Sequence, residues 1–193
     1  MCSTVPTAPE KILARPRSTC AWWPSVSKHV VGIHGIHDDP SDPGPFTARG
    51  VFAGIRAALR HRQGSDALTD RTVLLCDVDP DLAFAMSVEI GGSVVTQDNV
   101  YQTACDVYAP CAVGGTLNPG TMPRLRCDMV VGSANNQLES DSDADALAER
   151  GILYAPDYVV NAGGALAFTL IHQGKRNVAD ALDEIFAEAD VVG

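Results

Sequence analysis

The stretch from residue 129 to residue 164 constrains the fold of this chain more than any other part of its sequence. An apolar run ends in the loop 132–136, a helical pattern follows, and a second apolar run leads to the loop 161–164. Two successive strands are therefore each followed by a loop of small and amide side chains. Because open parallel sheets bind ligands outside the carboxyl ends of their strands, we expect both loops to face one cleft.

The same alternation of strand and helix patterns extends over most of the chain. We expect strands at 71–78, 93–96, 105–110, 127–132 and 152–156, and helices at 47–62, 80–90, 119–125, 143–150, 161–173 and 177–189. Thr47 is the expected N-cap of the first helix, and Asp79 followed by Pro80 begins the second. Alternating strands and helices predict an α/β fold with a mainly parallel sheet.

Composition excludes several classes of function. The formal net charge of −10 repels nucleic-acid phosphates and anionic lipid surfaces, so we expect neither a nucleic-acid nor a membrane partner. The chain has no run of eighteen apolar residues and no signal-peptide core, which favours a cytoplasmic protein. Its six cysteines form no C-x-x-C pair, and Cys76 and Cys127 are expected to be buried free thiols in strands.

The beginning of the chain differs from the remainder. Residues 1–28 show no sustained helical or strand period, so we predict an irregular leader there and a single truncated domain at 29–193. His29, His34 and His37 precede two aspartates, a combination that could bind a metal. The surrounding glycines and prolines favour a surface loop instead, and no metal site is predicted.

Asp77 follows the apolar run 72–76. A carboxylate at such a strand end can accept hydrogen bonds from both hydroxyls of an adenosine ribose, whereas the alternative is an ordinary turn aspartate. A G-x-G-x-x-G turn should precede such a carboxylate by roughly 20 residues, but the sequence has none there. The run 72–76 has room for one strand only, so one strand–helix unit is missing.

Both loops of the opening stretch contain asparagine. The amides of Asn135 and Asn136 can hold a nicotinamide ribose or a substrate carboxylate, or they can simply form a turn. Asn161 can be an N-cap, with Gly163 and Gly164 allowing close helix packing. Cys111 has no histidine near it in sequence, so nucleophilic catalysis is a minor alternative.

From about His29 to Asp190 the chain resembles the cofactor-binding domain of the leucine, phenylalanine and valine dehydrogenases. The matching blocks are DPSDPGPFTARGVFAGIRAAL, LLCDVDPDLA, CDVYAPCAVGGTLN, VVGSANNQL and GILYAPDYVVNAGG. The resemblance implies an incomplete Rossmann-like, doubly wound sheet with flanking helices. It also implies an enzyme that uses NAD to deaminate a branched-chain or aromatic L-amino acid oxidatively to a 2-oxo acid and ammonia.

The resemblance also assigns site residues. It implies cofactor contacts at Asp77, Val78, Cys111, Ala112 and Asn135, and substrate contacts at Asn136, Ala165 and Phe168. Phe168 is bulkier than the side chain usual at this position in the family, which would reshape the pocket for the substrate side chain.

Three departures from the family pattern accompany the resemblance. Residues 1–28 hold no counterpart of the catalytic domain and its lysines, so no catalytic residue is assigned, and the final family helices are cut short after Glu188. The first strand and glycine-rich turn are absent between Val73 and Leu74, a junction that an internal deletion or an error in the gene sequence would produce.

Two functions follow from these departures. The chain is either a dehydrogenase by ancestry that lacks activity alone, or an inactive remnant. Such a remnant would bind nucleotide weakly or associate with a full-length homologue through an exposed sheet edge, and self-association into a homo-oligomer is a further alternative. The missing strand should leave an unfilled seam in the sheet unless residues 72–76 close it.

Overall fold

The computed structural model describes residues 43–69, 71–173, 180 and 182. The chain divides into two compact units, one of residues 51–160 and one that combines 1–50 with 161–193. The predicted leader with its boundary at 28/29, the three histidines and most of the helix predicted at 177–189 lie outside the described residues.

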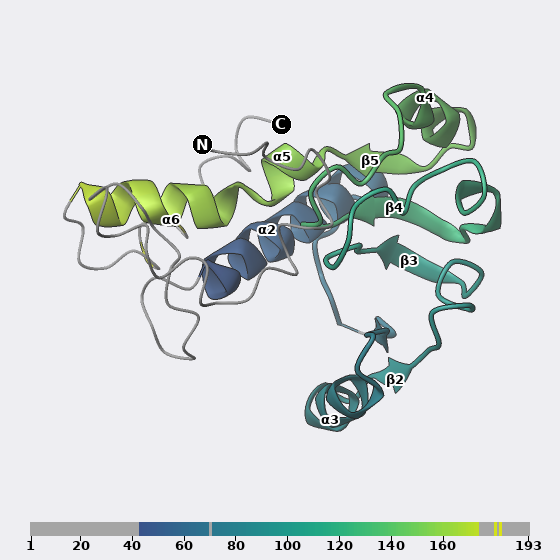
Figure 1. The fold of residues 1–193 in the computed structure, drawn as a ribbon, viewed down its shortest axis with the longest axis horizontal. Coiled ribbons are helices and arrows are strands. Elements are labelled where there is room, and N and C mark those ends of the chain that lie inside the picture. The colour runs from purple at the N-terminus through teal and green to yellow at the C-terminus, as the bar shows by residue number, and fades with distance from the viewer. Residues whose placement is uncertain (1–42, 70, 174–179, 181, 183–193) are drawn as a thin grey trace, which may run out of the picture. The chain divides into compact units, whose positions relative to one another are not determined.

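Unit 51–160 contains two separate parallel sheets. One has the order β3 (Cys105–Tyr108), β4 (Cys127–Val131) and β5 (Leu153–Ala155), which lie side by side in Figure 1. The other pairs β1 (Leu74–Leu75) with β2 (Ser93–Val94). The predicted α/β fold with a parallel sheet is confirmed, and so is the unfilled seam, because β1 and β3 do not pair.

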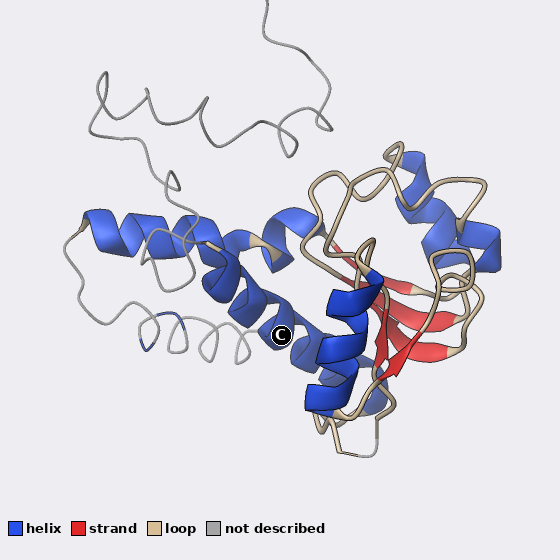
Figure 2. Ribbon diagram, turned by 60° about the horizontal axis from the view of Figure 1, so that its bottom comes forward, coloured by secondary structure: helices blue, strands red, loops and turns tan. Residues whose placement is uncertain are grey.

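Helices flank the strands of this unit (Figure 2). Met129 and Val131 of β4 pack against Leu59 of α2 (Gly44–Gln63), in the part of that helix that belongs to the unit. Val130 faces the other way and packs with Leu147 of α4 (Ser142–Glu149). Helices on both faces of the sheet give the doubly wound layering that the sequence predicts.

Helix α3 (Pro80–Ile90) begins and ends as predicted. The Asp79 carboxylate accepts hydrogen bonds from the N–H groups of Asp81 and Leu82 at 3.0 and 3.2 Å. Gly91 adopts a φ of 71°, the left-handed conformation that ends helices. Local chemistry therefore fixes both ends of this helix.

Three expectations are wrong. Thr47 does not cap α2, which begins at Gly44, and the Thr47 N–H donates to the carbonyl oxygen of Pro43 at 2.8 Å. The strand predicted as buried at 71–78 is only two residues long, and Cys76 is exposed. The cause is that, in the part of the chain that the structure describes, β1 has a strand neighbour on one side only, whereas Cys127, beside β3, is buried as predicted.

The remaining elements are short. Residues 119–125 form turns and a 3₁₀ helix, η3 (Met122–Arg124), and α5 (Asp157–Val160) follows β5. In the other unit, a Cβ on Gly163 of α6 (Ala162–His172) would lie 2.1 Å from the Phe46 carbonyl oxygen, which confirms the predicted close packing at this glycine. Among the helices of the described ranges, none is long and apolar enough to span a membrane.

Alkaline pH should destabilise unit 51–160. Burial raises the pKa of the Cys127 thiol from 9.0 to about 11, and it also raises the pKa of Cys105 and Tyr108. The folded chain keeps a proton that the unfolded chain releases, so stability present below pH 9 is lost as the pH rises towards 11. Urea unfolding across this window should show the free energy of unfolding falling, with a shallower fall in Cys127→Ala. Equal slopes for the two proteins would contradict the assignment to Cys127.

Candidate functional site

The loops at the carboxyl ends of β3 and β4 are joined by backbone hydrogen bonds. The N–H of Ala134 donates to the carbonyl oxygen of Pro110 at 3.0 Å, and the N–H of Gly115 donates to that of Asn136 at 2.7 Å. The N–H of Leu117 likewise donates to the Gln137 carbonyl at 2.9 Å. Loops 110–117 and 132–138 therefore form one surface, which we call the loop platform.

Small residues make the loop platform possible. A Cβ on Gly132 would lie 2.2 Å from the carbonyl oxygen of Pro110, and one on Gly114 would lie 2.3 Å from that of Asn135. Real Cβ atoms essentially never approach so closely. The glycines of the two motifs thus serve the mutual approach of the loops.

Asn136 is held from a third strand end. It has a φ of 54°, which asparagine tolerates in turns, and its N–H donates to Oδ2 of Asp157 at 2.6 Å. The fully buried Gln137 donates through Nε2 to the carbonyl oxygen of Gly132 at 2.8 Å. The side chains of Asn135 and Asn136 are exposed on this braced loop. Sequence reasoning missed Asp157 and Gln137 as supports, although both stand in the motif blocks that it singled out.

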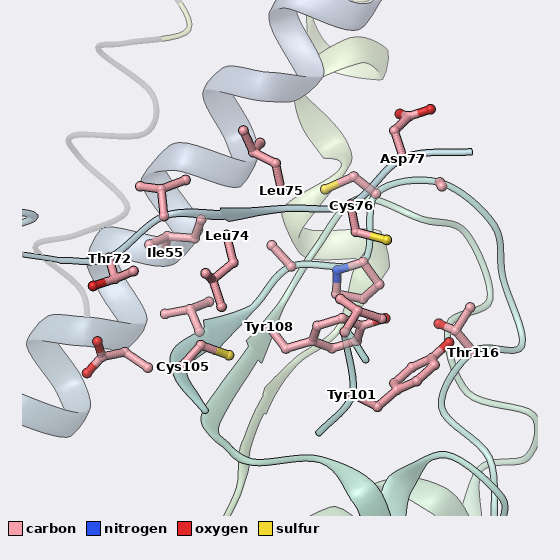
Figure 3. A pocket seen from close by; sticks show the side chains of 18 of the residues that line it. Ile55, Thr72, Leu74, Leu75, Cys76, Asp77, Tyr101, Cys105, Tyr108 and Thr116 are labelled. Atoms are coloured by element: carbon pink, nitrogen blue, oxygen red, sulfur yellow. The ribbon is translucent and has the colours of Figure 1, made fainter. Parts of the chain in front are cut away.

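A cavity of about 660 Å³ lies between β1 and β3 (Figure 3). Four of the five predicted cofactor residues line it, namely Asp77, Val78, Cys111 and Ala112. The fifth, Asn135, lies in the loop platform and does not line the cavity. The structure thus brings most of this set together at the ends of β1 and β3.

The mouth of the cavity beside β1 is acidic. Asp77 is exposed, and its Oδ1 accepts the N–H of Asp79 at 2.9 Å, so the turn role foreseen for Asp77 is present. Asp79 and Asp81 stand at the start of α3, where Pro80 has no N–H to offer. Three carboxylates and a proline nitrogen without a hydrogen make this helix start unsuited to a phosphate group.

The inner part of the cavity is aromatic and apolar. The rings of Tyr101 and Tyr108 have centroids 5.7 Å apart at an angle of 55°. Burial raises the pKa of the Tyr108 phenol, and Tyr101 adds to this rise, so Tyr108 stays neutral at physiological pH. The residues that line the cavity include no histidine, so none there could act as a base for the exposed Cys111.

The remaining predicted residues lie in the other unit. Ala165 is exposed and Phe168 is half-buried on α6. Because the two units are described separately, the expectation that these residues share a cleft with Asn136 stays a prediction. Within the described ranges, no group of three His, Cys, Asp or Glu side chains is arranged to hold a metal ion.

Comparison with known proteins places these features in context. The model of the Glutamate/Leucine/Phenylalanine/Valine dehydrogenase family matches residues 82–177. The chain is 34% identical over 179 residues to leucine dehydrogenase of Thermoactinomyces intermedius, which aligns 81% of this chain with 46% of that enzyme. It is 37% identical over 165 residues to phenylalanine dehydrogenase of Lysinibacillus sphaericus, covering 71% of this chain and 43% of that enzyme.

A solved structure gives the same result. The crystal structure of L-tryptophan dehydrogenase from Nostoc punctiforme matches with a TM-score of 0.70 at 33% identity, covering 75% of this chain and 51% of that one. This chain spans about half the length of the curated relatives it matches.

Substitution of Gly114 tests the loop platform. The methyl group of Gly114→Ala would meet the carbonyl oxygens of Asn135 and Asn136 at 2.3 and 2.8 Å, so the two loops must separate. We expect a loss of about 1–3 kcal/mol in the free energy of unfolding, measured with urea. Gly120→Ala is the matched control, because its methyl group meets only the side-chain oxygen of Asn118 at 3.2 Å. Equal losses in the two variants would refute the close approach.

Proposed function

Because this chain belongs to the Glutamate/Leucine/Phenylalanine/Valine dehydrogenase family, we propose that it supplies the cofactor-binding part of an amino-acid dehydrogenase. The proposed reaction is the oxidative deamination of a branched-chain or aromatic L-amino acid with NAD, which yields a 2-oxo acid and ammonia. The loop platform carries this proposal, because it displays Asn135 and Asn136 at strand ends, where open α/β sheets bind ligands.

The proposed cofactor contacts lie around the cavity and the loop platform. The exposed Asp77 carboxylate would accept hydrogen bonds from the ribose hydroxyls, a role that favours NAD over its 2′-phosphorylated relative. Val78, Cys111 and Ala112 line the same space and would contact the nucleoside. Asn135 would lie on the nicotinamide side.

The proposed substrate contacts come from both units. The exposed Asn136 amide would bind the α-carboxylate, supported by the bond from its N–H to Asp157. Ala165 and Phe168 would contact the substrate side chain. Relatives named as leucine, phenylalanine and tryptophan dehydrogenases support an apolar side chain as the substrate class.

The described residues could contact the two nucleosides of the dinucleotide, but they offer no suitable donors to its diphosphate. The sequence contains no G-x-G-x-x-G turn, and the helix that follows β1 begins with Asp79, Pro80 and Asp81. A helix start supplies N–H donors to a phosphate only where such side chains do not oppose it. The described residues also contain no lysine that could act as a base or bind a carboxylate.

Restoring the missing segment tests the proposed cofactor site. A chimera would carry, between Val73 and Leu74, the segment of the Thermoactinomyces intermedius leucine dehydrogenase that corresponds to this junction, where the family resemblance implies a strand and a glycine-rich turn. We expect calorimetry to show NAD binding at least about tenfold tighter than in the natural chain, because the graft supplies the diphosphate donors.

Asp77→Asn in the chimera should weaken NAD binding by about tenfold or more, since hydrogen bonds to charged groups contribute about 1.5–3 kcal/mol. Asp81→Asn is the matched control, because Asp81 lies in the first turn of α3 and not on the cavity. Unchanged NAD affinity in the folded chimera, or equal effects of the two substitutions, would contradict the proposed site.

The described residues lack a binding site for the diphosphate of NAD, and this lack favours a second function. The chain would then be an inactive relative that binds nucleotide weakly or associates with a full-length homologue. With NAD and leucine, phenylalanine or valine, the purified chain should produce no NADH above the blank, and it should co-purify with a tagged full-length homologue. Sustained NADH formation by the chain alone would exclude this second function.

A further inference from the structure

The gap between β1 and β3, which we call the seam, is bordered by two strand edges. Within the described residues, β1 pairs only with β2, and β3 pairs only with β4. The carbonyl oxygens of Val73 and Leu75 accept hydrogen bonds from the β2 side, at 2.9 and 2.8 Å. Because peptide groups alternate in direction along a strand, Leu74 and Cys76 direct their backbone N–H and C=O groups into the seam.

The opposite edge is arranged in the same way. The N–H of Cys105 donates to the carbonyl oxygen of Arg126 at 3.1 Å, and Cys105 pairs with Cys127. By the same alternation, Asp106 directs its backbone groups away from β4 and into the seam. Both borders of the seam therefore offer donors and acceptors at the spacing of a strand.

The two borders also run in the same direction. Arg71, just before β1, forms an ion pair of 2.6 Å with Asp106 near the start of β3. At the other end, Cys76 lies close enough to Tyr108 to contribute to its raised pKa, after burial and Tyr101. Figure 3 shows Thr72 and Cys105 towards one end of the pocket, and Cys76 and Tyr108 towards the other. A strand between β1 and β3 could thus be parallel to both.

The size and lining of the seam define its occupant. A strand in a packed sheet takes about 4.8 Å by 10 Å in cross-section and 3.3 Å in length per residue, or about 160 Å³. The cavity of about 660 Å³ therefore suits about four residues. Ile55 and Leu59 of α2 and the two tyrosines line it, and the charges of Arg71 and Asp106 in its lining pair with each other, so an occupant with apolar side chains is favoured. The exposed Asp77 at the far end favours a lysine after the apolar residues.

We propose that the seam accepts one extended apolar segment of a different protein, not of a second copy of this chain, and that this segment inserts parallel to β1 and β3 and hydrogen-bonds to both. The two sheets then become one, in the order β2, β1, inserted strand, β3, β4, β5. Addition of a strand to an exposed edge is a known mode of peptide recognition, and here two edges act together. The inference requires neither nucleotide binding nor turnover, but the inserted segment would compete with the nucleoside of the proposed function, because both would occupy the same cavity.

A peptide titration with the full chain tests the seam. The probe is a fluorescent peptide of four Val and Ile residues followed by two lysines, and binding is followed by anisotropy. We expect saturable binding that weakens at least tenfold when a proline replaces the second apolar residue, because proline cannot donate the ladder bond. Equal affinity for the two peptides would overturn the proposal.

Substitutions in the chain locate the bound peptide. Leu74→Asp places a charge in the seam and should weaken binding at least tenfold, whereas Val88→Asp, on an α3 side chain that is 69% exposed, should leave the affinity unchanged. Equal effects of the two substitutions would count against the seam.

Hydrogen exchange keeps the proposal testable if Leu74→Asp fails to fold. In the natural chain, the peptide should slow exchange of the amide hydrogens of Leu74, Cys76 and Asp106. Protection confined to other residues would overturn the proposal. Protection of these three amides without peptide, in a dimer that dissociates on dilution, would overturn it as well, because a second copy would then fill the seam.

Discussion

The burial of β4 on both faces is the constraint on which the rest of unit 51–160 depends. Met129, Val130 and Val131 are completely inaccessible to solvent, and they are covered by α2 on one side and by α4 on the other. β3 and β5 pair in parallel with β4 on its two edges, so the carboxyl ends of the three strands lie at the same edge of the sheet. This central strand determines where the loop platform lies, because the loops of the platform follow the ends of β3 and β4.

Local chemistry made much of this fold predictable. Asp79 with Pro80, and Gly91, determine the two ends of α3 through groups close to them in sequence. Gly163 allows a helix contact with the distant Phe46, and its lack of a side chain made that close packing predictable. The burial of β1 was mispredicted because it depends on a strand at each side, and within the described residues β1 has a neighbour on one side only. The support of Asn136 by Asp157 was missed because their hydrogen bond joins residues 21 positions apart.

Several unusual exposures accompany the one-sided pairing of β1, which has no strand on its other side among the described residues. Cys76 and Val73 are exposed beside a border of the seam. On α3, Leu82, Phe84 and Val88 are also exposed, at 52%, 65% and 69%. Apolar side chains in such number rarely stay uncovered on a soluble monomer, where they mark an interaction surface or a risk of aggregation.

The seam also separates unit 51–160 into two parts that should differ in stability. The contacts of Arg71 and Gln63 with Asp106 at one end of the seam, an ion pair of 2.6 Å and a hydrogen bond of 3.2 Å, are polar and partly solvated. Exposed pairs of this kind contribute little to stability. The segment from β1 to β2 should therefore open at a lower free energy than the β3–β5 sheet, as a cooperative unit of its own. A single melting temperature would then describe neither part, since one sheet can separate while the other stays folded.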